Sequence, residues 1–104
     1  MDEVFKALAD ASRRSLLDRL HVRGGQTLNE LCEGLAMTRQ AVTKHLAILE
    51  EADLVSTIRH GREKLHSLNP VPIHQIGERW IKKFERAKLV ALSELKRRLE
   101  QDDA

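Results

Sequence analysis

The chain has 104 residues, of which 41% are hydrophobic and 33% charged, a composition typical of one small globular domain with a highly charged surface. Three aromatic residues and two prolines disfavour a β-sandwich or barrel, and the single cysteine excludes an internal disulfide and fits a reducing cytoplasm. The net charge is only +2, so attraction to nucleic acid must come from the placement of charges rather than from their sum.

The organisation expected from these features is one domain over residues 1–104. The first ten residues carry acids and no long apolar run, unlike a signal peptide. No stretch approaches transmembrane length. We therefore expect a cytoplasmic protein without membrane contact.

Two helices are predicted at the start of the chain. In residues 2–9, Val4, Phe5 and Leu8 fall on one side. Asp10 is expected to cap the next helix, residues 11–22. Its apolar positions are Leu16, Leu17 and Leu20.

The first turn of that second helix carries two cations. Arg13 and Arg14 are poorly placed for the helix dipole, which favours acids there. This slightly unfavourable interaction with the helix dipole fits either arginines that bind an anionic partner or ordinary solvated surface arginines. Gly24-Gly25 then ends the helix.

A helix-turn-helix is predicted between residues 27 and 55. Thr27 and Glu30 form a capping box at the start of its first helix, and Thr38 is the N-cap of its second. Between the two helices lie only Ala36 and Met37. This is the spacing of a motif whose second helix enters the DNA major groove. The buried positions expected are Leu28, Leu31 and Leu35 in the first helix and Val42, Leu46 and Leu49 in the second.

The free face of the second helix has the chemistry of a DNA contact. Arginine and glutamine can bond guanine and adenine edges, and a threonine methyl can touch the methyl of thymine. Lysine and histidine suit phosphates, and residues 38–49 contain no acid. The same pattern also fits an amphipathic helix with a solvated polar face. The outward residues are Arg39, Gln40, Thr43, Lys44 and His45.

A β-hairpin is predicted over residues 55–68, with its tip at residues 60–63. Following a recognition helix, a basic hairpin is a wing that would lie over the DNA backbone, with Arg62 near the minor groove. Alternatively, the charges only block edge pairing with other sheets. A helix-turn-helix followed by a basic hairpin is a more specific signal of DNA binding than either motif alone. Its basic residues are Arg59, His60, Arg62 and Lys64.

A long helix is predicted from about residue 73 to about residue 100, roughly 40 Å at 1.5 Å per residue. Its apolar stripe is wider than one small domain can cover, and such a patch usually marks an interface. We therefore expect a two-fold dimer through the first and last helices, with recognition helices about 34–36 Å apart. The alternative is a monomer with the long helix folded back. The predicted interface residues are Val4, Phe5, Leu8, Ile76, Trp80, Phe84, Leu92 and Leu95.

The segments LADASRRSLLDRL, ELCEGLAMTRQAVTKHLAILEEADLV and HSLNP together resemble the ArsR/SmtB family of bacterial winged-helix repressors. The resemblance implies a mainly α fold with a small β-hairpin: four helices, the wing, and a final helix that dimerises together with the first. It also implies an operator-binding regulator, generally a repressor and often released by a ligand. It adds Thr38 to the DNA contacts already named. Ala36 stands where the family often has glycine, and a positive φ there would strain alanine by roughly 1 kcal/mol.

Many members of this family sense metals, but the ligand patterns are incomplete in this chain. Cys32 matches the first residue of the family's Cys-x-Cys site, whereas Gly34 occupies the second position. One thiolate does not make a tetrahedral zinc site, so Cys32 is expected to be a small buried core residue. His74 and Glu78 could share a metal-binding face, but the family's terminal-helix spacing is missing. We predict no metal and no cofactor.

The C-terminal run ERWIKKFERAKLVALSELKRRLE resembles a non-metal branch of the family, and Trp80 is expected to be core rather than the wall of a ligand pocket. The leading hypothesis is a homodimeric repressor of a palindromic operator, with room for a small-molecule effector of unknown identity. The alternatives are a winged-helix module that binds protein rather than DNA, and a metal-responsive repressor. An enzyme is not expected, because no nucleophilic triad or glycine-rich phosphate loop is visible.

Overall fold

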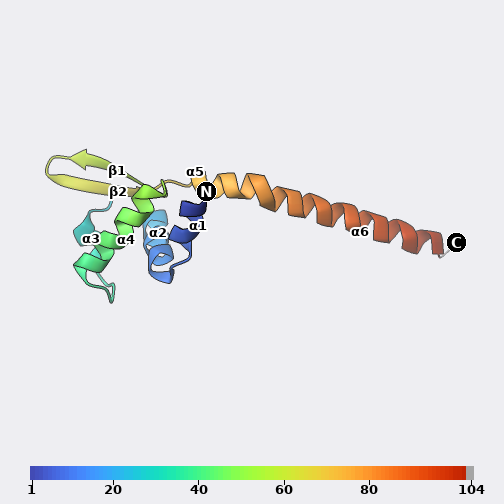
Figure 1. Ribbon diagram of the computed structural model, residues 1–104, viewed down its shortest axis with the longest axis horizontal. Helices are drawn as coiled ribbons and strands as arrows, with labels where there is room; N and C mark the ends of the chain where they lie inside the picture. Colours follow the sequence, from blue (N-terminus) through green and yellow to red (C-terminus); the bar gives the residue numbers. More distant parts are fainter. Residues whose placement is uncertain (103–104) are drawn as a thin grey trace. The chain divides into compact units, whose positions relative to one another are not determined.

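The computed structural model describes residues 1–102 and divides the chain into two compact units that meet between Ile73 and His74. The first unit is mainly helical with one antiparallel hairpin, as predicted, and Figure 1 shows the hairpin beside the cluster of four helices. Its elements are α1 (Asp2–Leu8), α2 (Ala11–Val22), α3 (Leu28–Cys32), α4 (Arg39–Glu51), β1 (Val55–His60) and β2 (Glu63–Leu68).

The three predicted helix caps are confirmed. The Asp10 carboxylate accepts hydrogen bonds from the backbone N–H groups of Ser12 and Arg13, at 2.8 and 3.2 Å. Thr27 and Glu30 each accept from the other's backbone N–H at 3.2 Å, which is the complete capping box. Thr38 accepts from the N–H of Ala41 at 3.1 Å and starts α4. These bonds satisfy donors that a helix start otherwise leaves unpaired.

The core of the first unit is built from the predicted stripes of α2 and α4. On both helices the expected apolar residues are buried: Leu16, Leu17, Leu20, Val42, Leu46 and Leu49. From α1 the buried side chains are Val4 and Ala7, and Ala7 was not predicted. Leu54, just before the hairpin, is fully buried as well.

The first helix of the helix-turn-helix is shorter than predicted. Leu31 is fully buried, but Leu28 and Leu35 are only half-buried, and α3 ends at Cys32. The helix ends there because Glu33 is extended and Gly34 takes a φ of +72°.

The turn that follows runs from Glu33 to Met37, so the expected two-residue connection was wrong. Gly34 supplies the left-handed residue of this turn, and Ala36 is not among the residues with positive φ. The strain considered at Ala36 is therefore absent. Cys32 is half-buried rather than buried.

The hairpin has the predicted limits and tip. His60 pairs with Glu63, and the two-residue loop between them contains Gly61 at φ +66°. At the opposite end, Asn69 donates from its backbone to Leu54 and from its side chain to Asp53, both at 2.8 Å. The hairpin is thereby held against the exit of α4.

A buried bridge between Gln26 and His66 also holds the base of the hairpin, and the sequence did not predict it. Their backbones exchange two hydrogen bonds, of 3.0 and 2.7 Å, and form an isolated β-bridge between Gln26 and strand β2. The His66 ring donates from Nδ1 to the Gln26 carbonyl at 2.9 Å, because a carbonyl can only accept. The Gln26 amide donates to the carbonyls of Arg19 and Arg23 at the end of α2. The bridge therefore connects α2 and the α3 entry to β2.

Beyond the hairpin, the described chain is helical from Val71 to Asp102. α5 (Val71–Ile76) leads to a π-helical turn, η1 (Gly77–Ile81), and then to α6 (Lys82–Asp102). The long helix was predicted, whereas the π-helical turn was not. Many apolar side chains of η1 and α6 are exposed in the single chain. They include Ile81, Phe84, Leu89, Val90, Leu92, Leu95 and Leu99. Within residues 1–102, no helix is long and apolar enough to cross a bilayer.

Candidate nucleic-acid interface

The polar face of α4 is exposed along its first half. Arg39, Gln40, Thr43 and Lys44 line an open hollow of about 510 Å³. Burial of Val42, Leu46 and Leu49 on the other side of the helix turns these four side chains outward. The structure thus brings four of the predicted contact residues together on one surface.

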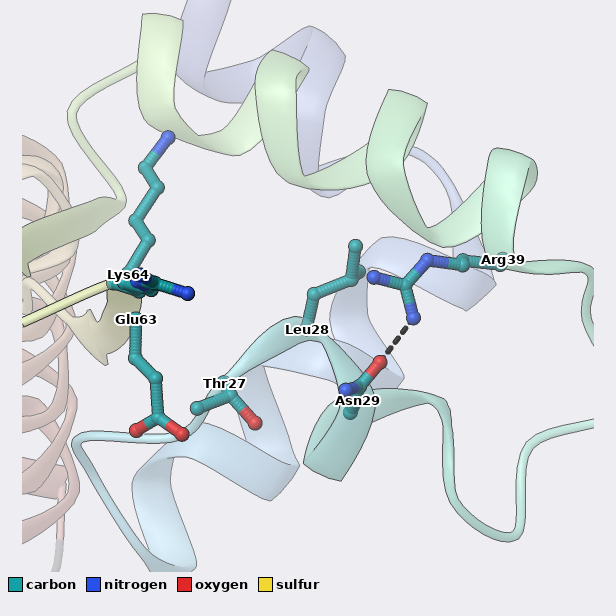
Figure 2. A pocket seen from close by; sticks show the side chains of 7 residues that line it. Thr27, Leu28, Asn29, Arg39, Glu63 and Lys64 are labelled. Atoms are coloured by element: carbon teal, nitrogen blue, oxygen red, sulfur yellow. Dashed lines mark hydrogen bonds between the residues drawn. The ribbon is translucent and has the colours of Figure 1, made fainter.

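Two of these side chains already have partners within the chain. Arg39 donates from Nη1 to the side-chain oxygen of Asn29, a contact drawn in Figure 2. The Thr43 hydroxyl donates to the Arg39 carbonyl at 2.9 Å. Since the hydroxyl of Thr43 is engaged by its own helix, its methyl group remains for an apolar contact.

His45 is less available than the other residues of this face. It is half-buried, and Arg13 Nη1 lies 3.3 Å from its Nδ1. An arginine can only donate, so the Nδ1 of His45 accepts this hydrogen bond. The ring therefore links α4 to α2.

The two arginines at the start of α2 bind the carbonyl end of α1. Arg13 donates to the carbonyls of Ala7 at 2.8 Å and Lys6 at 3.0 Å, and Arg14 donates to that of Leu8 at 2.7 Å. They satisfy the acceptors that the end of α1 leaves unpaired. This explains their position better than an anionic partner or a free solvated surface does. The backbone N–H of Arg13 is also the main cause that lowers the pKa of the Asp10 carboxyl.

The basic side chains of the wing lie partly in its loop and partly in its two strands. Arg62 lies in the exposed loop, and Arg59 lies directly opposite Lys64 in the strands, on the same face of the hairpin. His60 is also exposed. Lys64 forms an ion pair with Glu50 of α4, with 2.8 Å between its Nζ and the carboxylate Oε1.

A smaller hollow of about 190 Å³ lies where α3, α4 and the wing converge (Figure 2). Three of its lining side chains are cations and one is an acid, which gives it positive character. Glu63 and Lys64 approach it from β2, and Arg39 approaches from α4. Its lining residues are Thr27, Leu28, Asn29, Arg39, Arg62, Glu63 and Lys64.

The metal candidates do not come together in the described part of the chain, which contains no group of three or more His, Cys, Asp or Glu side chains placed to hold an ion. His74 Nε2 lies 3.6 Å from Glu78 Oε1, but the same oxygen lies 2.7 Å from the Lys82 ammonium. That ammonium is the main cause that lowers the pKa of Glu78. The Glu78 carboxylate is thus engaged by Lys82.

Two supporting residues were missed by the sequence analysis. Asn29 holds Arg39, and Glu50 holds Lys64. Neither pair follows a helical or strand spacing, because the partners meet only when α3 and the wing pack beside α4. Residues 38–49 contain no acid, and nothing in the sequence connects Glu50, which follows directly, with the wing.

Comparison with known proteins agrees with this architecture. A helix-turn-helix domain model matches residues 8–58. YuzN, an uncharacterized HTH-type transcriptional regulator of Bacillus subtilis, is 41% identical over 86 residues, which are 77% of this chain and 94% of YuzN. The transcriptional repressor SdpR of Bacillus subtilis is 33% identical over 84 residues, covering 81% of this chain and 91% of SdpR.

A crystal structure of an ArsR family transcriptional regulator matches the fold with a TM-score of 0.71 and 28% identity, covering 83% of this chain and 87% of the other. The match extends the likeness from the helix-turn-helix to most of the chain. The chain therefore belongs to the ArsR family of winged helix-turn-helix proteins and is a DNA-binding transcriptional regulator.

Proposed function

We propose that this regulator is a homodimeric repressor that binds a palindromic operator in the cytoplasm and has no catalytic activity. The observation that carries the proposal is the exposed face of α4 beside a basic wing in one compact unit. The name of SdpR, a transcriptional repressor, supports repression rather than activation.

The proposed base contacts lie in the first half of α4. Gln40 suits an adenine edge, Arg39 a guanine edge, and the Thr43 methyl a thymine. Thr38 and Lys44 would contact phosphates beside them, and His45 would join them only by giving up its bond to Arg13. From the wing, the proposed contacts are Arg59, His60 and Arg62.

The proposed dimer uses the terminal helices, and the chain 1–104 then acts as one functional domain. On α1, Phe5 is 43% exposed and Leu8 is half-buried, whereas Val4 is already in the protomer's own core. On the C-terminal helix the candidate residues are Ile76, Trp80, Phe84, Leu92 and Leu95. Apolar surface of this extent usually marks an interface.

The test is selection of bound duplexes from a random DNA pool, followed by salt titration of the winning sequence. We expect two inverted half-sites one helical turn apart and an affinity that falls steeply with salt. Single half-sites would contradict the dimer. Flat salt dependence would favour a protein-binding winged helix. Adding small molecules or metal salts to the same assay identifies an effector by loss of binding.

A further inference from the structure

The ion pair between Lys64 and Glu50 joins the wing to the last turn of the recognition helix. Lys64 Nζ lies 2.8 Å from Glu50 Oε1, and the Glu50 side chain is only 27% exposed. Oε1 itself is buried and accepts no hydrogen bond from another group in the described part of the chain. The Lys64 ammonium is thus the cation that compensates the charge of this half-buried carboxylate.

The direction of Lys64 follows from the pleat of the hairpin. Side chains alternate along β2, so Lys64 shares a face with the buried His66 while Glu63 lies on the other face. Figure 2 shows Lys64 extending from β2 toward α4 and Glu63 extending the opposite way. Lys64 is placed differently from Arg62, which lies in the loop, because its ammonium is paired with a carboxylate of α4.

The region between β2 and α4 beside the ion pair is hollowed. A cavity of about 340 Å³ separates the elements there, lined by Leu28, Thr43, Leu46, Ala47, Glu50, Lys64 and His66. The ion pair therefore connects β2 and α4 directly beside this cavity.

We propose that Glu50 is a positioning residue that holds the wing against the recognition helix and withholds Lys64 from DNA phosphates. This inference rests on the DNA binding proposed above. A phosphate that drew Lys64 away would separate the half-buried Glu50 carboxylate from the cation that pairs with it, which is unfavourable. Arg59, His60 and Arg62, and not Lys64, then supply the phosphate contacts of the wing.

The test compares salt dependence of binding to the duplex recovered by pool selection. Lys64→Ala should leave the slope of log K against log [salt] unchanged. Glu50→Gln, which is nearly isosteric, should free Lys64 and steepen the slope by about 0.9, the value of one added phosphate contact. The double variant should return to the wild-type slope. Glu51→Gln is the matched control, because Glu51 is an exposed neighbour on the same helix.

Two results would overturn the inference. One is a slope that becomes shallower by about 0.9 in Lys64→Ala, which would place Lys64 on a phosphate. The other is the same salt slope in Glu50→Gln and Glu51→Gln.

Hydrogen exchange of the free protein separates this inference from the proposed function. In Glu50→Gln, amides of β1 and β2 should exchange faster than in Glu51→Gln, whether or not DNA binds. Unchanged exchange contradicts the tether. Wild-type protein without salt-dependent DNA binding contradicts the proposed function instead.

Discussion

Replacing Leu92 and Leu95 by alanine should weaken the proposed dimer by about two orders of magnitude. These side chains are 52% and 54% exposed in the single chain. Fully burying a leucine contributes about 1.5–3 kcal/mol, so the remaining half contributes roughly 0.8–1.5 kcal/mol. A two-fold dimer contains four such side chains, which gives about 3–6 kcal/mol. Because alanine still buries its Cβ, we expect a loss near the lower end of this range. At 1.4 kcal/mol per factor of ten, the dissociation constant of the dimer then rises about 100-fold.

Sedimentation equilibrium over a range of protein concentrations measures this change directly. Arg97→Ala is the matched control, since at 3.6 residues per turn it lies on the opposite side of α6 from Leu92 and Leu95. Alanine is a strong helix former, so circular dichroism should show an unchanged helix content. An unchanged dissociation constant in the double variant, or a wild-type protein that stays monomeric at high concentration, would refute the reasoning.

Three further predictions concern base reading, phosphate contact and acid stability. Gln40→Ala should change base preference by about 1–3 kcal/mol of discrimination in a repeated pool selection, and an unaltered preference would remove Gln40 from base reading. Arg62→Ala should weaken all sequences alike and make the salt slope shallower by about 0.9, and an unchanged slope would exclude a phosphate contact. Asp10 has a pKa below its usual 3.8, mainly through the backbone N–H of Arg13, so its charge stabilises the fold above the unfolded pKa. That stability is lost as pH falls through the lowered folded pKa. In thermal unfolding at decreasing pH, the melting temperature of Asp10→Asn should therefore fall less than that of the wild type. The same dependence of melting temperature on pH in both proteins would contradict this role of Asp10.

Local chemistry explains why much of the first unit was predictable. The caps at Asp10, Thr27 and Thr38 involve donors only two or three residues away, so their signals lie in the sequence itself. The buried stripes of α2 and α4 follow helical periodicity, and Gly61 gives the loop of the hairpin a residue that tolerates positive φ.

Contacts between distant residues were not predictable in this way. Arg13 and His45 are 32 positions apart, and Gln26 and His66 are 40 positions apart. No period connects such pairs, because packing of separate elements brings them together. The end of α3 at Cys32 differs from these contacts because it has a local signal: Gly34 tolerates the positive φ that the turn requires, and the helix-turn-helix spacing alone does not use it.

The DNA contacts and the dimer interface remain predictions, since both depend on a second molecule. The structure limits them nonetheless. The bond to Arg13 occupies one ring nitrogen of His45, and Val4 offers little surface to a partner because it is 8% exposed.

The hairpin is held to the helices through its base and through Lys64, and its loop is exposed. Its base is tied through His66 and Asn69, whereas Gly61 and Arg62 are exposed. Substitutions in the loop can therefore accumulate without loosening the helices, while a change at His66 disturbs α2 and β2 together. We therefore expect that substitutions in that loop can change DNA affinity, in related or redesigned regulators, with little loss of stability.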